Sequence, residues 1–159
     1  MIKLEVKNLK IVKQLERNLK DLKTKEVAIG VLEGVGNYEN GKSVAEIGTI
    51  HEYGSVTKKI PQRSFLRTPF YQQQSRVDKV VNLSYKALTN GNVSVVQALS
   101  VVGTEAVNIS KGSFSDSARG EWKANSPMTV KMKGSSKPLI DTGRLRQSIN
   151  YVVRNKTQG

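Results

Sequence analysis

The chain of 159 residues contains no cysteine and only one histidine. Disulfides, zinc sites of the Cys/His type, iron–sulfur clusters and cysteine nucleophiles are therefore excluded. Acidic residues are also scarce, since 13 Asp and Glu stand against 26 Lys and Arg. These shortages remove many enzyme classes and leave a strongly basic chain.

Long apolar runs are missing as well. The most apolar stretch, residues 93–109, is interrupted by Gln97, Glu105 and Asn108. The sequence does not open with a basic segment followed by an apolar one, so we expect neither an export signal nor a membrane span, and we expect synthesis in the cytoplasm. A chain of this length can bury a core without disulfides or a metal, and we predict a single domain over residues 1–159.

The net charge of +13 suggests a nucleic acid or an acidic protein surface as partner. The charge is uneven along the chain. Residues 1–25 carry eight basic and three acidic side chains, residues 58–79 carry six and one, and residues 111–159 carry ten and three. Residues 26–57 instead carry five Glu and one Lys. Such a mosaic suits subunits that dock acidic patch to basic patch around a ring, and equally a monomer with a solvated basic face.

Hydrophobic periodicity predicts the first elements. Apolar and charged residues alternate over residues 2–7, which predicts a short strand, and residues 26–32 are rich in β-branched side chains, which predicts another. Between them, helical spacing predicts an amphipathic helix that covers a sheet and presents lysines to solvent. The apolar stripe of this helix comprises Leu9, Val12, Leu15, Leu19 and Leu22.

The remaining elements follow from caps and repeats. Ser43 and Glu46 form a capping box that predicts a helix ending at Gly54. Apolar repeats predict two long helices, from residue 70 to 88 and from 93 to 109, joined by a turn. Residues 112–137, rich in Ser, Gly and Lys, predict a long mobile loop.

We therefore expect an α+β fold. A small, mostly antiparallel sheet would comprise residues 2–7, 26–32 and 148–154 and would pack against the two long central helices.

Residues 36–43 match the phosphate-binding pattern G-x-x-x-x-G-K-[ST] and lie between a predicted strand and a predicted helix. However, no apolar run ending in Asp follows, and Glu39 would place a negative charge inside a phosphate cradle. We interpret the match as coincidental and keep nucleotide binding as a third hypothesis. No cofactor and no metal is expected.

Three stretches carry the most specific patterns. They are Thr-Ile-His-Glu-Tyr-Gly at residues 49–54, Ile-Pro-Gln-Arg-Ser-Phe-Leu-Arg at 60–67, and Pro-Leu-Ile-Asp-Thr-Gly-Arg-Leu-Arg-Gln-Ser-Ile at 138–149. In this order they resemble the tail-completion and virion-morphogenesis proteins of tailed bacteriophages, a group that includes Mu-like and HK97-like neck proteins. The resemblance implies a structural virion protein and no enzymatic activity.

By this resemblance, the chain forms a homo-oligomeric ring at the head–tail junction, between the portal or adaptor and the tail terminator or tail tube. The ring would assemble in the host cytoplasm and then belong to the virion, with non-specific contact to genomic DNA and none to a membrane. The alternative is a basic DNA-binding accessory protein that contacts phosphates through its lysine-rich N-terminal helix and C-terminal segment.

The candidate motif and interface residues come from these stretches and from one tryptophan. His51 is expected to have a structural role, because no Ser, Cys or Asp lies beside it in the sequence. Trp122 is expected either to bind a partner or to pack on its own core. Asp141 and Thr142 would cap a short helical turn, and Arg144 and Arg146 would flank it on the exposed side. The full set is His51, Glu52, Tyr53, Gly54, Pro61, Arg63, Phe65, Leu66, Trp122, Asp141, Thr142, Gly143, Arg144 and Leu145.

Overall fold

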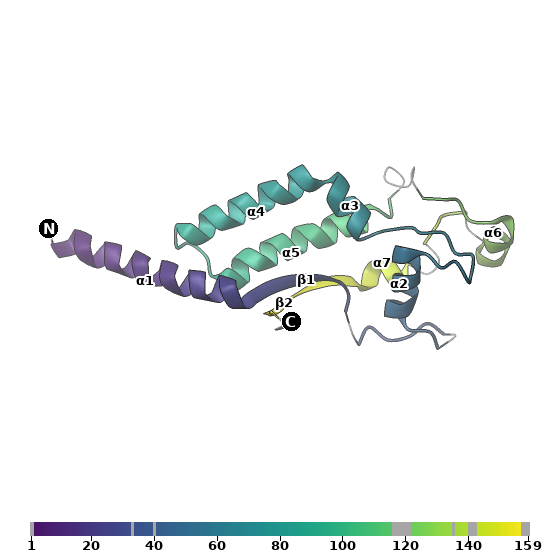
Figure 1. Cartoon of the computed structure of the whole chain (residues 1–159), viewed down its shortest axis with the longest axis horizontal. Helices are drawn as coiled ribbons and strands as arrows, with labels where there is room; N and C mark the ends of the chain where they lie inside the picture. The colour runs from purple at the N-terminus through teal and green to yellow at the C-terminus, as the bar shows by residue number, and fades with distance from the viewer. Residues whose placement is uncertain are drawn as a thin grey trace. The chain divides into compact units, whose positions relative to one another are not determined.

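A computed structural model of the chain describes residues 2–32, 34–39, 41–115, 122–134, 136–139 and 143–156, without the side chains of residues 2–8 and 133. These residues form helices and a two-stranded antiparallel sheet (Figure 1), which confirms the predicted α+β class. In chain order the elements are α1 (Ile2–Thr24), β1 (Lys25–Val31), α2 (Val44–Tyr53), α3 (Arg67–Gln72), α4 (Gln74–Thr89), α5 (Val95–Gly112), α6 (Pro127–Lys133), α7 (Arg144–Ser148) and β2 (Ile149–Asn155).

The chain forms two compact units. Unit 1 consists of Met1–Ala28, Ser75–Glu105 and Tyr151–Gly159, and unit 2 consists of Ile29–Gln74 and Ala106–Asn150. The elements β1, β2, α4 and α5 contribute residues to both units. The single domain expected from the length of the chain stays a prediction.

Unit 1 is built on a helical hairpin of α4 and α5, which run antiparallel (Figure 1). Gly91, with φ of +73°, forms the turn after α4, and its N–H donates to the carbonyl of Leu88 at 3.1 Å. Leu88 packs with Val95 and Ala98 in a buried cluster, against which Leu22 of α1 also packs. The predicted turn between two long helices is confirmed.

The strands of unit 1 pack closely on α5. A Cβ atom added at Gly103 would lie 2.4 Å from the ring of Tyr151, so the ring can lie on the helix only because this residue is glycine. Across the two strands, Arg154 pairs with Glu26 at 2.9 Å.

The strand predicted for residues 2–7 is wrong, because α1 begins at Ile2. Ile2, Val6 and Leu9 are four and three residues apart, so the same segment also fits a helical stripe. A six-residue alternation does not distinguish the two periods, and the long helical pattern that follows extends back through it. The sheet of the described residues consequently has two strands instead of three.

The apolar stripe of α1 is only partly covered. Leu15 and Leu22 are half-buried, and the buried residue between them is Asn18, whose side-chain amide donates to the carbonyl of Leu88 at 3.2 Å. The prediction that the whole stripe covers a sheet is therefore wrong. The exposed members and their exposed fractions are Leu9 (56%), Val12 (49%) and Leu19 (50%).

Two predicted segments differ in detail from the structure. The first long helix is divided at Gln73 into α3 and α4. The segment 112–137, predicted as a loop, contains α6, which Ser126 caps by accepting a hydrogen bond from the N–H of Thr129 and which Gly134 ends in the left-handed conformation. Residues 116–121 and 135 of this segment lie outside the described residues.

Unit 2 has a core from several short elements. Val44 of α2, Ile109 of α5 and Ile149 of β2 are almost fully buried. Helix α2 packs on α7, where a Cβ atom added at Gly48 would lie 3.2 Å from Leu145. Leu145 and Ile149 are both buried. The predicted helix cap at Ser43 is confirmed, because its hydroxyl accepts from the N–H of Ala45 at 3.2 Å.

Candidate functional site

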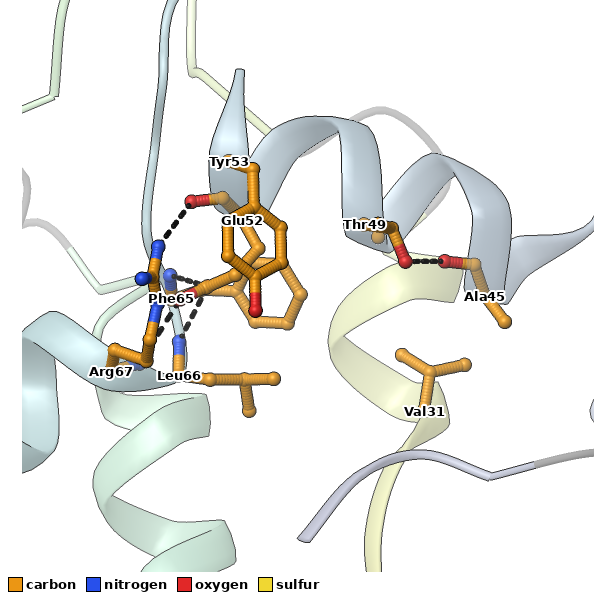
Figure 2. A pocket seen from close by; sticks show the side chains of 9 residues that line it. Val31, Ala45, Thr49, Glu52, Tyr53, Phe65, Leu66 and Arg67 are labelled. Atoms are coloured by element: carbon orange, nitrogen blue, oxygen red, sulfur yellow. Dashed lines mark hydrogen bonds and ion pairs between the residues drawn. The ribbon is translucent and has the colours of Figure 1, made fainter. Parts of the chain in front are cut away.

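The first two sequence motifs meet at the carboxylate of Glu52, in the last turn of α2 (Figure 2). Only 4% of Glu52 is exposed, and both of its carboxylate oxygens accept hydrogen bonds from residues 64–67, which we call turn 64–67. The donors are the backbone N–H groups of Phe65 (2.8 Å), Leu66 (3.0 Å) and Arg67 (3.1 Å) and the hydroxyl group of Ser64 (2.8 Å).

These backbone donors lie at the N-terminus of α3, where N–H groups have no partner within the helix. No side chain of the N-cap residue, Leu66, can accept from them. A carboxylate is the favoured acceptor there, because it also interacts with the positive end of the helix dipole. Glu52 thus caps α3 from a different helix, and the hydroxyl of Ser64 accepts a further bond from the N–H of Thr68 at 2.9 Å.

The environment of Glu52 keeps it ionised. Burial by itself raises the pKa of this carboxyl, but the hydrogen bonds from the N–H of Leu66, the hydroxyl of Ser64 and the N–H groups of Arg67 and Phe65 outweigh burial, so the pKa is lowered from its ordinary value of 4.5. Since both oxygens are occupied, Glu52 is placed to bind its own chain.

Tyr53 and Arg67 cover this carboxylate on its solvent side. The guanidinium of Arg67 donates to Glu52 at 3.1 Å and lies 4.3 Å from the ring centroid of Tyr53. Both side chains are largely exposed. An ion pair and a cation–π contact at such exposure contribute little stability, so the backbone bonds to Glu52 are the stronger part.

Gly54 and Pro61 belong to a narrow hairpin that follows α2. Ser55 and Ile60 exchange backbone hydrogen bonds of 2.9 and 2.8 Å, and Pro61 is half-buried after them. Gly54 has φ of +77°, and a Cβ atom there would lie 2.9 Å from the backbone nitrogen of Gln62. The glycine of the first motif therefore allows the second motif to return along α2.

Arg63 is buried and contacts the segment before α6. Its guanidinium donates to the carbonyls of Lys123 at 2.9 Å and Ala124 at 3.3 Å and to the side chain of Asn125 at 3.2 Å. Burial lowers the pKa of Arg63 from its usual value. Its backbone N–H donates to the carbonyl of His51 at 2.8 Å. This bond does not involve the His51 side chain, whose structural role stays a prediction.

Trp122 packs on an aromatic cluster of its own chain. Its ring meets Phe114 edge-on with centroids 5.5 Å apart, and Phe114 lies 5.5 Å from Phe65. The indole N–H donates to the carbonyl of Ser64 at 3.2 Å. Trp122 was expected either to bind a partner or to pack on its own core, and in the structure it packs on its own core.

The third motif reaches the same unit through α7. Gly143 precedes the helix with φ of +73°, Leu145 packs on α2, and the guanidinium of Arg144 lies 5.7 Å from the ring centroid of Tyr38. Arg146 is exposed and donates to the carbonyl of Lys111 at 3.1 Å. Asp141 and Thr142 lie outside the described residues, so their predicted capping stays a prediction.

Three further residues take part that are not in the set of candidate residues. Ser110, fully buried, donates from its hydroxyl to the carbonyl of Phe65 at 2.8 Å. Ser64 and Arg67 were part of the second motif but were given no contact with Glu52. Only the proximity of the two motifs in the sequence indicated that they could meet.

The segment 36–43 does not form a phosphate cradle in its described residues. The N–H of Tyr38 donates to the carbonyl of Lys42 at 2.8 Å, and that of Gly41 donates to Tyr38 at 2.9 Å. The hydroxyl of Ser43 caps α2. A phosphate site needs backbone N–H groups that face the ligand, so this geometry supports a coincidental match.

A cavity of about 240 Å³ lies beside the Glu52 carboxylate. Figure 2 shows Tyr53 and Leu66 on one side of it and Val31, Ala45 and Thr49 on the other. Among the described residues, no group of three or more His, Asp or Glu could hold a metal ion. None of the described helices is long and apolar enough to cross a membrane.

Comparison with known proteins adds no family. No protein-family model, no curated protein and no solved structure matches this chain. The resemblance to phage neck proteins therefore stays a prediction based on the three motifs.

Glu52→Gln should lower the free energy of unfolding at neutral pH by about 2–4 kcal/mol, because an amide leaves part of the buried N–H array without an acceptor. Urea unfolding measures this. Glu46→Gln, at an exposed position of the same helix, is the matched control and should change the stability by less than about 0.5 kcal/mol.

The contribution of Glu52 is present above pH 4.5 and is lost as the pH falls through its lowered pKa, so the wild type should lose stability in acid more steeply than Glu52→Gln. Equal losses of stability in acid by the wild type and Glu52→Gln would contradict the assigned role.

Gly54→Ala should destabilise the protein more than Gly41→Ala by about 1–3 kcal/mol. Both glycines have φ of +77°, so both substitutions carry the strain of the left-handed region. Only at Gly54 does the added Cβ meet backbone atoms, since no described atom lies within 4 Å of a Cβ at Gly41. Thermal unfolding compares the two variants. Equal decreases in Tm would show that the hairpin leaves room for a Cβ atom at Gly54.

Proposed function

We propose that this chain is a structural protein of the head–tail junction of a tailed bacteriophage, where copies form a ring between the portal or adaptor and the tail. The observation that carries the proposal is that the motif residues contact their own chain. Glu52, Arg63 and Gly54 bind or accommodate their own chain, and the three stretches that resemble neck proteins meet in one unit. Residues used in this way build a rigid framework for docking.

The exposed stripe of α1 supports assembly. Leu9, Val12 and Leu19 are about half exposed on one helix, together with Ile11 at 45%. Soluble monomers seldom leave such a run of large apolar side chains in water, and larger exposed patches mark interaction sites. An assembled state would cover them.

The distribution of charge also supports docking between copies. Closed rings use two different patches on each subunit, and this chain has one acidic segment, residues 26–57, among basic ones. Opposite charges on the two patches would guide subunits into register. The net charge of +13 would also suit contact with the DNA that passes through a neck.

A second candidate is favoured by the basic face of α1. Lys10, Lys13, Arg17, Lys20 and Lys23 are all exposed along this helix. Such a row suits phosphate contacts in a DNA-binding accessory protein. That function would not require the chain in the finished particle.

Deletion of the coding sequence from its phage or prophage genome tests the proposal. We expect induced lysates to contain filled heads and free tails that are not joined, as seen by electron microscopy, with joining restored by the wild-type chain supplied in trans. Joined, tailed particles in the deletion lysate would contradict the junction role and would favour the accessory protein.

A further inference from the structure

We infer that α6 of one copy binds the cavity beside α2 of a second copy, with Met128 and Met132 as the inserted side chains. This contact deepens the proposed function, since it rests on the self-association that a ring requires. It joins two different surfaces of unit 2, and both belong to described residues.

The receiving surface is the cavity in Figure 2. Its apolar walls come from Val31, Ala45 and Leu66, and the exposed ring of Tyr53 stands at its edge. The Glu52 oxygens beside it are all hydrogen-bonded to turn 64–67, so the cavity offers a mainly apolar site. The cavity has a volume of about 240 Å³.

The inserting surface is one face of α6. Met128 and Met132 are four residues apart and therefore neighbours on the helix, and they are 74% and 80% exposed. Val130, on another side, is half-buried and fixes the helix on its own unit. Methionine is flexible enough to fill an irregular cavity, and its sulfur interacts favourably with aromatic rings such as that of Tyr53.

The α6 face and the surface beside α2 carry residues of opposite charge. Residues 122–139 contain four lysines and no acidic residue. Lys131 is exposed on the methionine face, three residues after Met128. On α2, Glu46 is exposed three residues before Thr49, which lines the cavity. Insertion of the methionines would bring Lys131 toward Glu46, whereas two α6 faces, which carry lysines and no acidic residue, would repel each other.

The contact is heterologous, so each copy still offers a free α6 face and a free cavity after one pairing. Repetition of such a contact closes into a ring or continues as a filament. This geometry distinguishes the contact from a two-fold dimer, in which the same surface faces itself.

Cysteine cross-linking tests the contact directly, because the natural chain has no cysteine. Thr49→Cys and Met132→Cys are made as separate single-cysteine variants, mixed, and treated with a short bismaleimide. We expect a covalent dimer in the mixture and little in either variant alone. A mixture of Lys58→Cys, at an exposed position outside both surfaces, with Met132→Cys is the matched control. Absence of the mixed dimer, or equal yields in the control mixture, would overturn the inference.

A charge exchange gives a second measurement on the intact chain. Glu46→Lys and Lys131→Glu should each raise the apparent dissociation constant of self-association by about 10-fold or more, and the double variant should restore it, as measured by light scattering. Met128→Ser/Met132→Ser should raise it by about 30-fold, whereas Met128→Leu/Met132→Leu should leave it nearly unchanged. Self-association without the cross-link or the charge rescue would overturn the α6 contact alone, whereas joined particles in the deletion lysate would overturn the junction role.

Discussion

A buried carboxylate needs a hydrogen-bond donor for each of its oxygens, and Glu52 has them in turn 64–67. This requirement fixes the end of α2 against the start of α3. Turn 64–67 also positions Phe65 on Phe114, and its carbonyls accept hydrogen bonds from Ser110 and Trp122. The hairpin after Gly54 and the bonds of Arg63 then follow from the same placement. The contacts that turn 64–67 makes with Phe114, Ser110 and Trp122 therefore depend on one ionised side chain.

The dependence explains why the motif residues have these identities. Glutamate is needed as an acceptor for several backbone N–H groups, glycine at position 54 for a positive φ beside another backbone, and arginine at position 63 for a fork of donors directed at carbonyls. None of these demands involves a substrate. They suit a subunit that must keep its shape while neighbours dock on it, which is the basis of the proposed role at the head–tail junction.

The sequence predicted the fold class, the helical hairpin of α4 and α5, and the bounds of α2, because caps and long periodic patterns are local signals. It mistook residues 2–7 for a strand, because six residues fit two periods, and it missed α6, because that helix of seven residues has little periodicity. The motifs indicated which residues matter. The bonds of Glu52 to residues 64–67 could not be predicted, because they depend on a tertiary turn that brings residues 12 to 15 positions apart together.

The most direct test of the role of Glu52 is its own pKa. The NMR shift of its side-chain carboxyl carbon, assigned by comparison with Glu52→Gln, gives this pKa in a titration from neutral pH into acid. We expect a midpoint below the ordinary pKa of 4.5, because the hydrogen bonds of turn 64–67 favour the ionised form over the opposing effect of burial. A midpoint at or above 4.5 would show that the turn does not bind the carboxylate in solution and would contradict the central role assigned to it.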